Sequence, residues 1–152
     1  MINKLNFPEY PFSLREGKAG IEIFDDLRRK FIKLTPEEWV RQHLLRYIIM
    51  EKNFPASLIA VEYSLTYNQL KKRCDALVFN VQAKPLVLIE CKSEKVELKQ
   101  NILEQIGRYN FGLNVPYLLI SNGLLHYMLA CKSTAEGQKM ELLSEIPTFD
   151  AL

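Results

Sequence analysis

The sequence predicts a single α/β domain in which a mixed β-sheet is flanked by helices. The chain has 152 residues, which is about the length of one domain. Apolar residues recur at helical spacing in two segments and form short strand-like runs in five others. The expected core order is α-β-β-β-α-β, followed by one more strand and preceded by an N-terminal β-hairpin.

Composition predicts a soluble, globular protein of the reducing cytoplasm. Hydrophobic residues make up 48% of the chain and charged residues 25%, and the net charge is only +2, so a nucleic-acid site would have to be local. The three cysteines show no C-x-x-C spacing, so zinc is not expected. No apolar run approaches the ~20 residues of a membrane span, and the N-terminus lacks the apolar core of a signal peptide.

Residues 1–20 contain several proline and glycine breaks, and we expect them to form an arm on the surface. Residues 21–34 alternate in a β-like manner and predict a hairpin. A short amphipathic helix over residues 24–34 fits the same pattern almost as well. The sequence leaves these two alternatives open.

A helix is expected from Thr35 to about Lys52. Thr35 can cap it, Pro36 suits its first position, and Glu38 stands three residues after the cap. An apolar stripe with 3.6-residue spacing follows, formed by Trp39, Val40, His43, Leu44, Tyr47 and Ile48. Both histidines of the chain, His43 and His126, lie within apolar patterns and are interpreted as core or boundary residues rather than ligands.

The rest of the chain alternates strands with one further helix. Strands are expected over residues 58–65, 74–80, 85–92, 117–121 and 124–131, and a helix over about 97–113. The run Leu86–Ile89 is apolar on both faces, as expected of a central strand. Asn122-Gly123 predicts a two-residue hairpin turn, and the segment after Lys132 is expected to be a weakly structured tail.

Two carboxylates are expected to face each other across one predicted hairpin. If residues 81–84 form the loop between the second and third strands, Asp75 lies directly opposite Glu90. Opposed residues have Cβ atoms only about 4.5–5.5 Å apart, so the two charges repel. A divalent cation between them would turn this repulsion into attraction.

Lys92 joins the same group. Side chains alternate along a strand, so Glu90 and Lys92 share a face while Cys91 points to the other. A hard cation held by carboxylates can polarise a phosphoryl oxygen and activate water, and a lysine can stabilise the growing negative charge. Asp75, Glu90 and Lys92 therefore predict phosphodiester hydrolysis with Mg²⁺, and Mn²⁺ is expected to act as a substitute for it.

These residues resemble those of a known family. Asp75, a short hairpin and Glu90-x-Lys92 look like the PD-(D/E)xK nuclease superfamily. The segments Leu34–Gln42, Lys72–Asp75 and Ile89–Lys92 are similar to the N-terminal nuclease domain of type I restriction enzyme R subunits. The resemblance covers about residues 21–131, leaving residues 1–20 as an arm and 132–152 as a tail, and it implies a restriction-endonuclease-like fold.

The resemblance also implies roles for individual residues. Asp75 and Glu90 would be metal ligands and Lys92 the catalytic lysine. A glutamate of the first helix would complete the metal site, with Glu38 as our candidate and Glu37 as the substitute. Gln105 and Tyr109 fit the Gln-x-x-x-Tyr motif of RecB-type members, and they would contact substrate or brace the lysine from one face of the second helix.

Two departures leave the function open between alternatives. Cys74 stands where the superfamily's name has proline, and no Walker motif is present, so ATP-driven restriction would need other restriction-system subunits or a motor protein. The first hypothesis is an Mg²⁺-dependent endonuclease that acts on DNA. Whether such an enzyme would form a homodimer is left open. The second is a catalytically idle nuclease-fold module that binds DNA or docks a partner. Six basic residues are interpreted either as a rim that binds a phosphate backbone or, with equal weight, as an ordinary solvent-exposed surface: Lys71, Lys72, Arg73, Lys95, Lys99 and Arg108.

Overall fold

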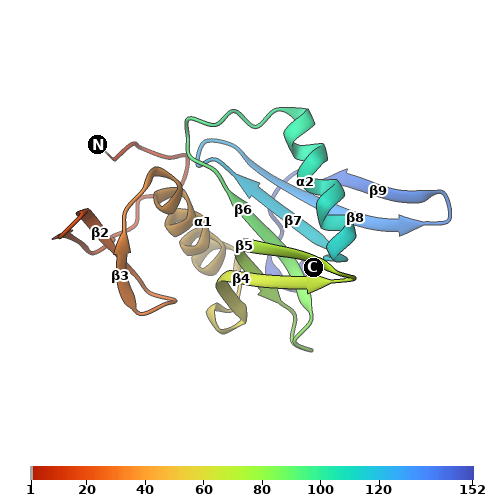
Figure 1. The fold of residues 1–152 in the computed structure, drawn as a ribbon, viewed down its shortest axis with the longest axis horizontal. Helices are drawn as coiled ribbons and strands as arrows, with labels where there is room; N and C mark the ends of the chain where they lie inside the picture. Colours follow the sequence, from red (N-terminus) through yellow and green to blue (C-terminus); the bar gives the residue numbers. More distant parts are fainter. Residues whose placement is uncertain (1) are drawn as a thin grey trace.

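The computed structural model describes residues 2–152 and contains two sheets (Figure 1). The larger sheet has six strands in sequence order: β4 (Ile59–Tyr67), β5 (Leu70–Phe79), β6 (Pro85–Cys91), β7 (Tyr117–Ser121), β8 (His126–Thr134) and β9 (Gly137–Leu142). Neighbouring strands are antiparallel except for β6 and β7, which run parallel. The sheet is therefore mixed, as predicted.

Two helices, α1 (Pro36–Lys52) and α2 (Gln100–Leu113), cover opposite faces of this sheet. Side chains of α1 such as Leu44 and Ile48 pack in one core with Val78 and Ile89. A second core on the other face contains Leu113 of α2 and residues of the central strands. The α/β class with helices flanking a mixed sheet is confirmed, and the arrangement is consistent with a restriction-endonuclease-like fold.

The beginning of α1 follows the predicted capping pattern. Thr35 is the N-cap, and its Oγ1 accepts a hydrogen bond from the backbone N of Glu38 at 3.0 Å. Pro36 occupies the first turn, where a missing N–H costs nothing. Asn53 in the left-handed conformation, with a φ of 59°, ends the helix. This cap fixes the positions of Glu37 and Glu38 in the first turn of the helix.

The β4–β5 hairpin is longer than predicted. We expected the second strand to begin at residue 74, but β5 begins at Leu70, directly after a two-residue turn. The turn residues Asn68 and Gln69 have φ values of 47° and 69°, the pattern of a type I′ turn. Because Gln69 stands where glycine is usual, this turn was hard to predict from the residue pattern. The extra residues bring Lys72 into an ordered strand.

The N-terminal segment forms a small antiparallel sheet beside α1 (Figure 1). The strands β2 (Gly20–Asp25) and β3 (Lys30–Lys33) confirm the hairpin predicted for residues 21–34 and exclude the helical alternative. The expectation of a simple surface arm over residues 1–20 is wrong in part, because β1 (Leu14–Gly17) pairs with β2. Leu5 is buried as well, so the arm also contributes to the core.

The C-terminal segment is more ordered than expected. Residues 132–152 do not form a weakly structured tail, because β8 continues to Thr134 and pairs with β9. The two-residue turn at Asn122-Gly123 is also wrong, since β7 and β8 are joined by residues 122–125. Asn122 Oδ1 accepts from the backbone N of Leu124 and of Leu125 at 3.0 and 2.8 Å, which stabilises this longer loop.

Cys74 and Cys91 are buried free thiols, and Cys131 is a half-buried one. Burial raises the pKa of Cys74 to about 11, and it raises the pKa of Cys91 well above its ordinary value. These two thiols remain protonated at neutral pH and serve as packing groups. Within residues 2–152, no helix has both the length and the apolar content needed to cross a bilayer.

Candidate functional site

Asp75 and Glu90 are brought together by the β5–β6 ladder. The ladder pairs Ala76 with Ile89, which is the register expected from folding about the middle of the connecting loop. Asp75 and Glu90 are the next residues along the two strands. The hairpin therefore carries both carboxylates to the same point, where the ladder ends.

Asp75 is held by the main chain of the neighbouring strand. Its Oδ2 accepts a hydrogen bond from the backbone N of Cys91 at 2.7 Å. Its other oxygen, Oδ1, lies 3.9 Å from Nη1 of Arg41, and the side chain is 21% exposed. One carboxylate oxygen is thus fixed by the strand, while the other has only a long ionic contact.

Glu90 is buried, with 4% of the residue exposed. The ammonium of Lys72 lies 2.8 Å from Glu90 Oε1 and forms an ion pair. Within residues 2–152, this ammonium is the one cation that lies within 4.0 Å of the buried carboxylate. Burial raises the pKa of Glu90, Lys72 acts in the opposite direction, and the charge of Asp75 raises the pKa further. A nearer or stronger cation would favour its ionised form.

Glu37 is the glutamate of α1 that lies in the field of these groups. Partial burial raises the pKa of its carboxyl, and the charge of Asp75 adds to this effect. Lys92 and Arg41 act in the opposite direction. Glu37 is exposed at the surface, so its carboxylate is accessible to solutes.

Glu38, our first candidate for a helical metal ligand, is occupied by other partners. Its Oε2 accepts from Nε of Arg41 at 2.9 Å and from Nε2 of Gln42 at 3.0 Å. Its Oε1 is paired with Arg41 and, at 3.3 Å, with Nη2 of Arg28. Because both oxygens of Glu38 are already bound, the geometry favours the substitute Glu37 as a ligand.

Lys92 lies just past the end of β6, where its backbone N donates to the carbonyl of Ser121 at 2.8 Å. This bond ties the residue to β7. Its side chain is half-buried, and no carboxylate of residues 2–152 lies within 4.0 Å of its ammonium. Lys92 still contributes to the electrostatic surroundings of Glu37 and Glu90. Its charge is therefore close to the acids but free to meet another anion.

The two residues of the predicted motif on α2 differ in their surroundings. The hydroxyl of Tyr109 donates to the backbone carbonyl of Lys71 at 2.7 Å, and its ring centroid lies 6.0 Å from Nζ of Lys72. Tyr109 thus braces β5 beside Lys72 rather than Lys92. Gln105 is exposed, and in the described part of the chain its side chain has no hydrogen-bond partner.

Glu62 links the site to the N-terminal sheet and was not identified from the sequence. Its carboxylate lies 3.2 Å from Nη1 of Arg28, 3.4 Å from Nη2 of Arg41 and 3.0 Å from Nη2 of Arg73. Burial acts to raise the pKa of Glu62, but the three arginines outweigh it and lower the pKa. The spacing of Glu38 and Arg41 along one helix was the only sequence signal for this network.

The donor groups suit a hard divalent cation, although they are not yet closed around one. Among residues 2–152, no three His, Cys, Asp or Glu side chains are already arranged as a metal cluster. Asp75, Glu90 and Glu37 nevertheless offer carboxylate oxygens, which Mg²⁺ prefers. The charge of Asp75 raises the pKa of both glutamates, and a cation shared by the three would relieve that repulsion. Metal binding would require these side chains to move closer together.

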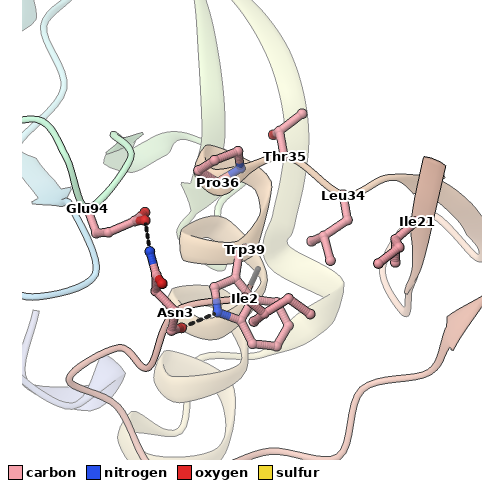
Figure 2. A pocket seen from close by; sticks show the side chains of 8 residues that line it. All are labelled: Ile2, Asn3, Ile21, Leu34, Thr35, Pro36, Trp39 and Glu94. Carbon is pink, nitrogen blue, oxygen red and sulfur yellow. Dashed lines mark hydrogen bonds between the residues drawn. The ribbon is translucent and has the colours of Figure 1, made fainter. Parts of the chain in front are cut away.

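A separate pocket lies at the beginning of α1 (Figure 2). Its volume is about 260 Å³, and Trp39 is one of the apolar residues that line it. Asn3 bridges two sides of the pocket: its carbonyl accepts from Nε1 of Trp39 at 2.9 Å, and its amide donates to Glu94. The lining does not include Asp75 or Glu90. The pocket is therefore not part of the acidic site.

Fold and site together define an α/β domain with an acid–lysine constellation at one end of a central hairpin. Residues 36–147 match the family described as type I restriction enzyme R protein N terminus (HSDR_N). The match covers more than half of the chain, so this protein belongs to that family, as the resemblance predicted. Comparisons with curated proteins and with solved structures find no match. The matched region contains every residue of the constellation, from Glu37 to Tyr109.

Proposed function

We propose that this domain is a metal-dependent nuclease that hydrolyses DNA phosphodiester bonds in a restriction-type system. The supporting observation is the meeting of Asp75 and Glu90 at the end of one ladder, next to the free ammonium of Lys92. Family membership supports DNA as the substrate, because restriction enzymes act on DNA. Other restriction-system subunits or a motor protein are the partners that this family suggests, and the cytoplasm is the compartment that we propose.

Three carboxylates would hold the metal. Asp75 would use Oδ1, because Oδ2 is held by the backbone N of Cys91. Glu90 and Glu37 would supply the remaining protein oxygens, and Mg²⁺ or Mn²⁺ would fit such a set. When bound, the ion supplies Lewis acidity and lowers the pKa of a coordinated water. Arg41 keeps the strand segment in place through its 3.4 Å hydrogen bond to the carbonyl of Asp75.

Lys92 would meet the scissile phosphate. In hydrolysis, a water molecule gives up a proton as its oxygen forms a bond to phosphorus, the bond from phosphorus to the leaving ester oxygen breaks, and that oxygen takes up a proton, so that one water is consumed overall. Negative charge grows on the phosphoryl oxygens in this step, and a fixed ammonium stabilises it. Lys92 is suited to this role since no carboxylate of residues 2–152 neutralises it within 4.0 Å. Gln105, exposed on α2, would contact the substrate backbone.

Plasmid cleavage by the purified chain with Mg²⁺ or Mn²⁺ tests this proposal. The variants are Asp75→Asn and Lys92→Ala, and the matched control is Lys84→Ala, which removes an exposed lysine from the loop that joins β5 and β6. We expect metal-dependent nicking by the wild type and by Lys84→Ala and its loss in the two site variants. Equal products from all four proteins across a range of metal and salt would refute the nuclease assignment.

A second candidate function is a catalytically idle nuclease-fold module that binds DNA or docks a partner. The ion pair of Lys72 with Glu90 favours it, because a protein ammonium already compensates one of the proposed ligands. Salt-sensitive DNA binding that is independent of metal and of Asp75 would support this candidate. Metal affinity that is lost in Asp75→Asn would support the nuclease. The DNA-binding and metal-affinity measurements use the same purified proteins, and neither depends on cleavage of DNA.

A further inference from the structure

Two lysines lie near Glu90, and the structure gives them different partners. Lys72 reaches Glu90 from β5, with 2.8 Å between Nζ and Oε1. Lys92 follows Glu90 on its own strand, but within residues 2–152 its ammonium has no carboxylate within 4.0 Å. The two lysines therefore differ: the ammonium of Lys72 is paired with the buried Glu90, whereas that of Lys92 has no carboxylate partner in the described residues.

Lys72 is placed at Glu90 by its surroundings. The hydroxyl of Tyr109 fixes the preceding residue through its 2.7 Å hydrogen bond to the carbonyl of Lys71. The ring of Tyr109 lies 6.0 Å from Nζ of Lys72, at the outer limit of a cation–π contact. The side chain of Lys72 is still 31% exposed, so a route to solvent remains open. Helix α2 thus holds this ammonium near Glu90 without enclosing it.

We propose that Lys72 is an internal counter-ion that occupies Glu90 Oε1 until a divalent cation displaces it, so that this lysine sets the metal affinity of the site. The inference rests on the proposed nuclease function and adds a regulatory residue to it. A buried carboxylate must be paired, and Lys72 supplies that charge when no metal is bound. One oxygen does not accommodate an ammonium and a divalent cation together, since the two positive charges repel at this distance.

Displacement is physically reasonable for this pair. The flexible stem of lysine lets its ammonium move to water, where it is strongly hydrated. Lys72 is the one cation within 4.0 Å of the Glu90 carboxylate in residues 2–152, so its departure breaks a single charged contact of 2.8 Å. The metal contributes two charges in place of one. Removing the competitor should therefore tighten metal binding by about tenfold, the effect of ~1.4 kcal/mol.

Mn²⁺ titration by calorimetry on the full chain tests the proposal. Lys72→Met keeps the side-chain length and removes the charge, and Lys71→Met removes the same charge from the exposed neighbouring residue. We expect Lys72→Met to bind Mn²⁺ about tenfold more tightly than the wild type, and Lys71→Met to change the affinity less than twofold. Equal affinities of the two variants would overturn the proposal while leaving the nuclease assignment intact. Absence of Mn²⁺ binding in every protein would overturn both.

A second measurement uses the wild type and does not depend on how a variant folds. The rate of amine acetylation at each lysine is followed by mass spectrometry, with and without saturating Mn²⁺. Displacement predicts that Lys72 becomes several-fold more reactive when Mn²⁺ binds, while the exposed Lys95 stays unchanged. An unchanged rate at Lys72, alongside calorimetric evidence of Mn²⁺ binding, would show that the ion pair persists and that Lys72 does not yield to the metal.

Discussion

The carboxylate of Asp75 and the backbone N of Cys91 are joined by a hydrogen bond of 2.7 Å. The side chain proposed as a metal ligand therefore also closes the ladder between β5 and β6. Cys91 is completely buried, so its N–H has no access to water in place of this acceptor. Asp75 thus has a structural role that is separable from its proposed chemical role.

Two substitutions separate these roles. Asp75→Asn keeps a side-chain oxygen for the N–H of Cys91, so the free energy of unfolding should change by less than about 1 kcal/mol. Asp75→Ala leaves that N–H unpaired and should cost about 1–3 kcal/mol. Both should weaken Mn²⁺ binding at least about tenfold, because a charged ligand is lost. Urea denaturation and calorimetry measure the two effects, and equal stability of the Asn and Ala variants would rule out the structural role.

Removing Arg41 should destabilise the domain strongly. The guanidinium is buried, and it pairs with Glu38 and lies 3.4 Å from Glu62. Arg41→Met leaves the buried Glu38 with fewer positive partners, and breaking a buried pair in this way costs about 3–5 kcal/mol. The change in unfolding free energy by urea denaturation is the readout.

The double variant Arg41→Met/Glu38→Gln is the control for this prediction. Neutralising Glu38 removes the uncompensated charge, so the double variant should recover stability relative to Arg41→Met alone. If the stability losses of the single variants Arg41→Met and Glu38→Gln simply add up in the double variant, Arg41 and Glu38 are not energetically coupled. The same comparison applied to Mn²⁺ affinity would show whether Arg41 also supports the proposed metal site through Asp75.

Stability should decrease on the acid side because of His126. Burial lowers the pKa of His126 below its ordinary value of 6.5, although the hydrogen bond from Nε2 to the carbonyl of Asn6 acts in the opposite direction. Between the folded and unfolded pKa values, the unfolded chain binds more protons, so stability rises with pH. The contribution is complete above about pH 6.5 and is lost as the pH falls from there toward the lower folded pKa.

Urea denaturation of the wild type and His126→Gln at several pH values checks this sign. The variant should show a smaller loss of stability between about pH 7 and pH 5 than the wild type. The substitution should not abolish the dependence of stability on pH, because burial also lowers the pKa of His43. A wild-type stability that increased on acidification over this range would contradict the folded-state environment described for both rings.

Much of the fold was predictable because the deciding signals are local. Thr35 and Pro36 mark the start of α1, and the doubly apolar run Leu86–Ile89 identifies the central strand. Strand β9 was missed for a physical reason: it lies at the edge, is mostly exposed, and pairs with β8 through its backbone, so it needs no apolar alternation. The strand β1 at the other end of the chain has the same character.

The candidate site was predictable in part. The symmetry of the connecting loop predicted the register that brings Asp75 and Glu90 together. The sequence did not decide between Glu37 and Glu38, because adjacent helical residues diverge in direction and only packing shows that Glu38 meets two arginines. The pairing of Lys72 with Glu90 is a contact across strands, and no spacing along one element indicates it.

Substitutions at Gly107 of α2 test how closely β9 packs on this helix. A Cβ built at Gly107 would lie 1.9 Å from Sδ of Met140 in β9. Alanine favours a helix by about 1 kcal/mol over glycine, and the sulfur belongs to the flexible end of a half-buried methionine that can move aside at a small cost, so Gly107→Ala should stabilise by less than about 1 kcal/mol. Met140→Ala removes the obstructing sulfur, and in that background the same Gly107→Ala change should give the full gain of about 1 kcal/mol. Urea denaturation of the four proteins measures this difference, and an equal effect in both backgrounds would show that β9 does not pack against α2 as described.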